Sequence, residues 1–326
     1  MMTDTDIIST TLQNNLRSAM AAELTTIPTY LYAYWSIKPL NDGGSQAGAQ
    51  AAQTIMSVIV EEMLHMGLVS NILNSLGGTP ALTESPYLPQ YPCPLLRPPI
   101  SEGEIDVEVK LGRLSYDSIK NFLSIEFPEY YDLCSGILTL GQFYEQYIRP
   151  ELTEDLNYCS RRKQLPTFDN PGVGTLIQVG CQQDALKAVD LIVKQGEGFS
   201  NNEHEDGEHE LAHFWKFLGV YRAIEQGFLN LDTDVYQVID APYEHEYNQE
   251  QQEANRAFNS TYSNLLDELQ STFSSNHPEV FYKSTTLMKQ LNRQAAVLRN
   301  TGGTVPDTDD LPGPTFEYIP AGERVN

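Results

Sequence analysis

Positive charge is scarce in this chain of 326 residues, which has 20 lysine and arginine residues against 44 aspartate and glutamate residues. The formal net charge is −24 at pH 7. Nucleic acids and anionic membranes are polyanions, so a protein of this charge would be repelled by them rather than attracted. We therefore expect neither a nucleic acid nor a membrane as a partner.

Cysteine pairs and long apolar runs are also lacking. The four cysteines lie far apart and form no C-x-x-C, which gives no support to a zinc knuckle or a dithiol redox motif. The first residues, MMTDTD, are acidic and do not resemble the basic and apolar regions of a secretory signal. No uninterrupted apolar run approaches the length of a membrane span. A cytoplasmic protein is therefore the expectation.

Apolar side chains recur every three or four residues in several long segments, which predicts amphipathic helices. The chain is long enough to bury a large core, and we expect one all-α domain over residues 1–326. A shorter helix is expected at about 184–194, and an irregular tail should close the chain. The predicted bundle helices lie at about 6–37, 45–76, 133–149 and 208–226, and the C-terminal region 247–326 adds helices at about 247–273 and 278–299.

The segment at about 79–113 interrupts this helical pattern. Seven prolines stand between Pro80 and Pro99, and an alternating Ile105-Asp-Val107-Glu-Val109 segment follows them. Proline is disfavoured in helix interiors, and strict alternation is typical of a strand. We therefore predict a loop-rich, proline-rich insert with a short hairpin instead of a bundle helix.

Two of the predicted bundle helices carry a Glu-x-x-His motif on the apolar face, Glu62 with His65 and Glu210 with His213. Residues three apart are neighbours on a helix surface, so the carboxylate and the imidazole of each motif project together. An uncompensated carboxylate on an apolar face would cost several kcal/mol, and an ionised one is normally paired or bound to metal. Both motifs are therefore candidate ligand pairs.

Glu23 and Glu145 are lone carboxylates on the apolar faces of the other two bundle helices. One Glu from each of two helices, with a Glu-x-x-His from each of two others, is the ligand pattern of two-metal sites in helical bundles. Glu61 lies about 100° around the helix from Glu62 and is interpreted as a solvated or supporting residue. The predicted metal ligands are Glu23, Glu62, His65, Glu145, Glu210 and His213.

The segment from His209 to His213 allows a second interpretation, because it also matches the H-E-x-x-H motif of zinc hydrolases. In those enzymes the two histidines bind zinc and the glutamate acts as a general base. That interpretation gives Glu62 and His65 no role. A non-catalytic metal-binding or storage protein is the other alternative.

Tyr30 and Tyr34 lie one turn apart on the helix face that carries Glu23. Packing is the ordinary role of such tyrosines. Beside a metal site they can also line a pocket or relay electrons, which makes them the candidate catalytic residues.

Several segments, in order along the chain, resemble one known family. They are AELTTIPTYLYAYWSI, VEEMLHMGLVSNILNSLGGTP, YLPQYPCPLL, SIEFPE, TLGQFYEQYI, QGEG, LAHFWKF and GPTFEY. Together they run from about residue 7 to 320 and are similar to the ferritin-like domain named for iminophenyl-pyruvate dimer synthases of bisindole biosynthesis. Those synthases are far larger, and this chain resembles their ferritin-like part alone.

The resemblance implies a ferritin-like four-helix bundle with additional helices and assigns the same six residues as ligands of two iron ions. Oxygen and nitrogen ligands also suit manganese, so an Mn/Mn or Mn/Fe pair is an alternative. The implied activity is that of a non-haem diiron oxidase or oxygenase in natural product biosynthesis. It would activate O2 to oxidise or couple a small, amino-acid-derived metabolite, with a homodimer as the candidate assembly.

Overall fold

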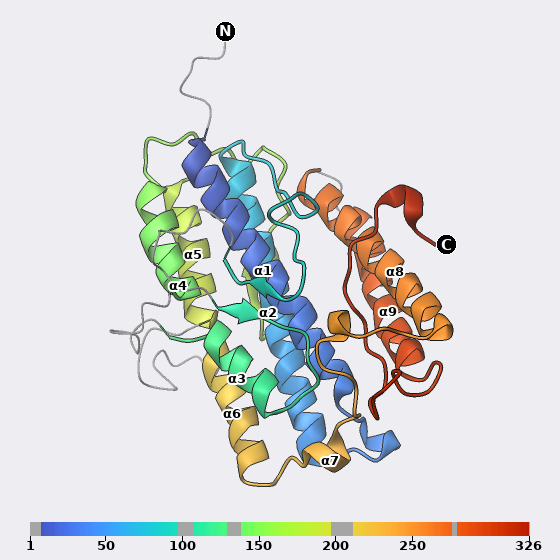
Figure 1. The fold of residues 1–326 in the computed structure, drawn as a ribbon. Helices are drawn as coiled ribbons and strands as arrows, with labels where there is room; N and C mark the ends of the chain where they lie inside the picture. Colours follow the sequence, from blue (N-terminus) through green and yellow to red (C-terminus); the bar gives the residue numbers. More distant parts are fainter. Residues whose placement is uncertain (1–7, 97–106, 129–137, 197–210, 276–278, 326) are drawn as a thin grey trace.

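Two long helices run side by side through the middle of the molecule (Figure 1). In the computed structural model, which describes residues 8–96, 107–128, 138–196, 211–275 and 279–325, α1 spans Thr10–Ser36 and α2 spans Gln46–Ser75. Serine side chains cap both starts, since Ser9 Oγ accepts from the Leu12 amide and Ser45 Oγ from the Gly48 amide. These two helices match those expected at 6–37 and 45–76.

The α2 helix is long and apolar enough, by length and composition, to cross a membrane. However, 72% of its most apolar window is buried inside the protein. Such burial is typical of a core helix, so no membrane span is indicated. The helix gives way to Gly77, whose φ of +79° lies in the left-handed region that favours glycine.

Four shorter helices cover one face of the α1–α2 pair and lie end to end in two columns (Figure 1). One column consists of α3, Tyr116–Ile125, and α4, Leu140–Phe143. The other consists of α5, Gln182–Gly196, and α6, His213–Glu225. Each column takes the place of one helix of a four-helix bundle, so the bundle contains two continuous helices and two divided ones.

The helix predicted at 133–149 differs from the expectation in its start and its pitch. Thr139 and Gln142 form a capping box that starts α4 at Leu140, and residues 133–137 lie outside the described part of the chain. The chain then passes directly into a π-helical turn, Tyr144–Ile148. A wider turn rotates every following side chain relative to its place in an α-helix.

The opposite face of α1 and α2 is covered by the C-terminal helices α8, Gln249–Phe273, and α9, Glu279–Arg299 (Figure 1). Both match the helices expected there. A short α7, Leu231–Asp234, lies between α6 and α8 along the chain. The structure is thus mostly helical, as the sequence predicts.

Two small antiparallel strand pairs lie in the connections between the helices. In the proline-rich insert, β1, Cys93–Pro94, pairs with β2, Glu108–Val109, in agreement with the expected hairpin. Further along, β3, Phe168–Asn170, pairs with β4, Gly174–Leu176, a feature that the sequence did not predict.

Candidate metal centre

Five buried side chains meet where α1 and α2 face the two columns. Glu23 comes from α1, Glu62 and His65 from α2, Glu126 from the C-terminal end of α3, and His213 from the first turn of α6. None of the five is more than 3% exposed. Segments far apart in the sequence therefore place carboxylates and imidazoles in one dry interior site.

The five residues form two groups that share Glu62. Within each group, one candidate ligand atom from each residue lies within 4.8 Å of the others. In the first group, His65 Nδ1 is 3.5 Å from Glu23 Oε2 and 3.7 Å from Glu62 Oε2. In the second, His213 Nδ1 is 3.0 Å from Glu62 Oε1 and 3.4 Å from Glu126 Oε2. Glu62 thus offers one carboxylate oxygen to each group, the arrangement of a bridging ligand.

Hydrogen bonds at the far side of each ring turn Nδ1 of both histidines toward the carboxylates. His65 Nε2 is 3.0 Å from Gln195 Oε1, an oxygen that can only accept. His213 Nε2 is 2.6 Å from Glu61 Oε2. In both rings Nε2 therefore carries a hydrogen, and Nδ1 faces the centre, where it can bind a metal ion once its own proton is lost. Such outer hydrogen bonds fix the tautomer of metal-binding histidines.

The two histidines are held by unlike partners. Glu61 is 1% exposed and also accepts hydrogen bonds from Lys216 Nζ at 2.7 and 2.8 Å. The Nε2 atom of His213 is therefore hydrogen-bonded to a carboxylate, whereas that of His65 is hydrogen-bonded to the neutral amide of Gln195. The sequence interpretation of Glu61 as solvated is wrong, and its alternative, a supporting residue, matches the structure.

Three buried atoms of the cluster have no hydrogen-bond partner among the described residues, namely Glu23 Oε2, Glu62 Oε2 and His213 Nδ1. Buried polar atoms are normally satisfied, and an unpaired buried charge costs several kcal/mol. Lys216 balances only one of the carboxylates Glu23, Glu61, Glu62 and Glu126. The oxygen and nitrogen donors suit iron and manganese. The residues therefore fit transition-metal ions.

The pKa values show how strongly these groups interact. Burial and the neighbouring Glu62 raise the pKa of Glu23 to about 7. Burial alone would lower the pKa of His65, but Glu23 and Glu62 raise it to about 10. Burial would raise the pKa of Glu61, but His213 and Lys216 hold it at about 2. In the absence of metal, Glu23 and His65 therefore hold protons near neutral pH that a cation would displace.

Two buried tyrosines donate hydrogen bonds to carboxylates of the centre. Tyr30 Oη is 2.5 Å from Glu126 Oε1, and Tyr144 Oη is 2.6 Å from Glu23 Oε1. Burial and the nearby carboxylates raise the pKa of both phenols well above the usual value, so they remain protonated donors. Tyr30 therefore lies at the centre as expected, and Tyr144 is an addition that the sequence did not predict.

The structure does not bring every predicted site residue to the centre. Glu145 is 32% exposed and accepts a hydrogen bond from Arg149 Nε at 2.7 Å, whereas the neighbouring Tyr144 is buried and reaches Glu23. This corrects the predicted position of Glu145. Tyr34 lines a separate apolar cavity. Glu210 and His209 lie outside the described residues.

Glu126 is the site residue that the sequence analysis missed. It follows Ile119 and Phe122 at helical spacing, and these two side chains form the buried face of α3. A carboxylate at the end of an apolar stripe is the signal that identified Glu23. The helix that carries it spans only 10 residues, too few for apolar periodicity to define a buried face from the sequence.

Comparisons with known proteins agree with the fold described above. The family model described as Ferritin-like matches residues 16–222, more than half of the chain. A crystal structure of a ferritin-like protein from Caulobacter vibrioides has a TM-score of 0.65 to this structure and 22% sequence identity. That match covers 96% of this chain and 99% of the other and shows a shared fold. No curated protein matches the sequence.

Proposed function

The chain belongs to the ferritin-like family, and on this basis we propose that the protein is a non-haem oxidoreductase. Two iron ions would activate O2 to oxidise or couple a small organic metabolite. The observation that carries this proposal is the shared position of Glu62 between two groups of buried ligands. A carboxylate bridge would hold two ions close enough to act on one O2 molecule.

Each residue of the centre would have a defined role. Glu23 and His65 would hold one ion, and Glu126 and His213 would hold the other. Glu62 would contact both ions. Two adjacent ions would supply the electrons that reduce O2, a redox capacity that the side chains lack. Tyr30 and Tyr144 would orient Glu126 and Glu23 through the protons on their hydroxyl oxygens. Burial of all these groups would keep water from the reacting atoms.

The substrate class rests on the resemblance to iminophenyl-pyruvate dimer synthases and is part of the proposal. An amino-acid-derived imine or 2-oxo acid is the class to test first. A shared fold does not by itself define a reaction, so coupling of two such molecules is the more specific form of the proposal. A homodimer and a cytoplasmic location also remain proposals.

The decisive experiment measures iron and oxygen together. Metal-free protein is loaded with Fe(II) without air, the bound ions are counted, and O2 uptake is followed with and without amino-acid-derived imines. We expect about two ions per chain and O2 uptake coupled to loss of the organic compound. O2 uptake without loss of the organic compound, with many iron ions accumulating per chain, would instead support the storage alternative.

Metal content of three variants separates this centre from a zinc hydrolase site. We expect His65→Ala and Glu210→Ala to lose metal and His209→Ala to keep it. A zinc hydrolase would give the reverse for the histidines, since His209 would bind zinc and His65 would have no role. Retention of metal by Glu210→Ala would show that the sequence prediction of Glu210 as a ligand is wrong.

A further inference from the structure

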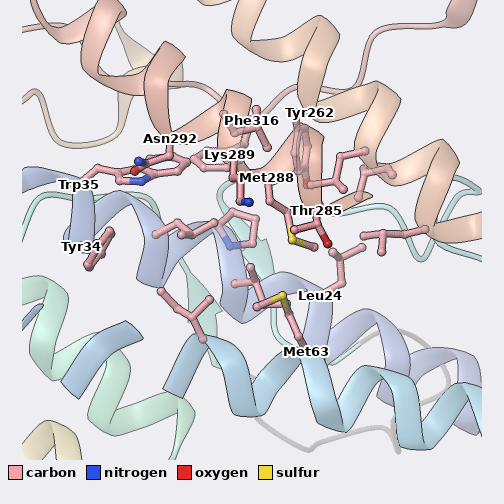
Figure 2. Close-up of a pocket in the computed structure, with 18 of the residues that line it drawn as sticks. Leu24, Tyr34, Trp35, Met63, Tyr262, Thr285, Met288, Lys289, Asn292 and Phe316 are labelled. Atoms are coloured by element: carbon pink, nitrogen blue, oxygen red, sulfur yellow. The ribbon is translucent and has the colours of Figure 1, made fainter. Parts of the chain in front are cut away.

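An apolar cavity of about 370 Å³ lies between the α1–α2 pair and the α8–α9 hairpin (Figure 2). Its size falls within the roughly 300–1,000 Å³ of pockets that hold small ligands. None of the five residues of the metal centre lines it. Leu24 and Met63 in its wall follow Glu23 and Glu62 by one residue, which turns them about 100° around their helices. The cavity and the metal centre therefore lie on different faces of the same two helices.

The wall of the cavity is adaptable and almost entirely apolar. Methionine side chains are unbranched and polarisable, so they fit apolar groups of varied shape. Rings from α1 and the C-terminal tail complete the surface. The methionines and two of these rings are Met56, Met63, Met66, Met288, Trp35 and Phe316. Such a wall favours a flexible hydrocarbon body over a rigid polar one.

Lys289 is the single charged side chain among the described residues that line this cavity. Its presence is notable because acidic residues outnumber basic ones by 44 to 20 in the whole chain. Figure 2 shows its nitrogen turned toward the space between the helices. One cation at the edge of an apolar cavity, with no acid in the wall, is complementary to a ligand with one negative charge.

Tyr262 supplies a second polar group. Its side chain is 3% exposed, and its buried hydroxyl has no hydrogen-bond partner among the described residues. Leaving such a donor unpaired is unfavourable, and a hydrogen bond to a ligand oxygen would relieve it. The cavity therefore combines a largely hydrocarbon wall and one cation with a lining tyrosine whose buried hydroxyl lacks a partner among the described residues.

We propose that this cavity binds a long-chain monocarboxylic acid of the fatty-acid class. Its carboxylate pairs with Lys289 Nζ, its hydrocarbon chain lies along the methionine wall, and the Tyr262 hydroxyl donates to a ligand oxygen. A phosphate monoester is a poorer match, since its nearly double charge faces only one lysine in a protein of net charge −24. This ligand is distinct from the substrate of the metal centre, because the metal-ligand residues do not line the cavity.

The two tryptophans of the chain allow a direct test. Trp35 lines the cavity, whereas Trp215 lies in α6. Trp215→Phe leaves Trp35 as the single indole donor of excitation energy. The probe is cis-parinaric acid, a fluorescent polyene fatty acid, added to the full-length metal-loaded protein. We expect saturable energy transfer from Trp35 at one probe per chain, reversed by excess palmitate.

Variants in this background test the chemical class. Lys289→Met keeps an apolar stem without the charge and should weaken acid binding about tenfold, while binding of the methyl ester stays unchanged. Tyr262→Phe should weaken acid binding severalfold. The control is Lys187→Met, an exposed lysine of α5. Absence of energy transfer, equal affinity of the unmodified protein for acid and ester, or unchanged acid affinity in Lys289→Met would overturn the proposal.

Discussion

Glu62 is the residue on which the two-metal interpretation depends most. Because it belongs to both ligand groups, Glu62→Gln should lower iron binding at both positions. Glu126→Gln should affect only the group that contains His213. Counting bound Fe(II) per chain at saturating metal distinguishes the two variants. We expect close to no tight ions for Glu62→Gln and about one for Glu126→Gln.

Glu145→Gln is the matched control for these variants. It makes the same chemical change at a glutamate that the sequence predicted as a ligand and the structure places beside Arg149. Its iron content should equal that of the unmodified protein. Loss of an ion in Glu145→Gln, with retention in Glu126→Gln, would show that the fourth carboxylate ligand was identified incorrectly.

Glu61 gives a second prediction at the residue scale. Its carboxylate holds His213 Nε2 and is itself held by Lys216, so Glu61→Gln weakens the anionic support behind one ligand only. Loss of such an outer partner typically costs about 10–100-fold in metal affinity. We expect one of two binding steps to weaken by that factor in a metal titration, with the other unchanged.

The exposed Glu225 of α6 provides the control for this variant. Glu225→Gln should leave both binding steps as they are. Equal weakening of both steps in Glu61→Gln would contradict the assignment, because it would indicate a general loss of structure instead of a local effect at His213.

The candidate ligands could be predicted from sequence where the local structure is a regular α-helix. Glu23, Glu62 and His65 lie on long, continuous helices, so counting in steps of three and four identified their buried face. Glu145 was misplaced because the neighbouring Tyr144 takes the buried position, and the apolar pattern does not distinguish two adjacent residues at the edge of the buried face. Glu126 was missed because its helix is short. Glu61 required knowledge of Lys216, which lies 155 residues away in sequence.

At the scale of the element, α3 is the part that positions Glu126. Its Phe122 packs against Tyr30 and Phe217, with ring centroids 4.7 and 5.1 Å apart. Phe122→Ala should lower the free energy of unfolding by about 3–5 kcal/mol, because it leaves a cavity in this aromatic cluster. It should also reduce iron binding, since α3 is then free to shift. Denaturant unfolding and metal counting measure the two effects.

Ser124→Ala is the control on the same helix, since Ser124 is exposed. It should change the free energy of unfolding by less than about 0.5 kcal/mol. Full iron binding by a destabilised Phe122→Ala protein would show that Glu126 is positioned by contacts other than those of α3.

The division of the bundle into columns was beyond the reach of sequence patterns. The α1, α2, α8 and α9 helices were predicted to within a few residues because their apolar periodicity is long. The α3 and α4 helices have only 10 and 4 residues, too few for periodicity to define an element. Their end-to-end placement depends on contacts with α1 and α2 that form only in the folded protein.

For the whole molecule, metal binding should release protons. At neutral pH the metal-free protein has a protonated His65, because Glu23 and Glu62 raise its pKa from 6.5 to about 10. A histidine must lose that proton to bind a metal ion. Affinity should therefore increase with pH between about 6 and 10. Titration calorimetry in two buffers of different ionisation enthalpy counts the released protons.

His65→Asn tests the source of these protons, since it removes the titrating ring. The variant should release fewer protons per bound ion and show a shallower dependence of affinity on pH. An unchanged proton count would assign the release to the other members of the cluster.

The unlike partners of the two histidines also determine how a population of molecules responds to scarce metal. An imidazole that is hydrogen-bonded to a carboxylate is the stronger electron-pair donor to a metal ion. The first ion should therefore bind to the group of His213 in nearly every chain. One metal ion per chain, half of the full load, would then give a uniform singly loaded species in place of a mixture of empty and full chains. A second, different metal added afterwards would occupy the group of His65, and the order of addition alone would decide which mixed pair is formed.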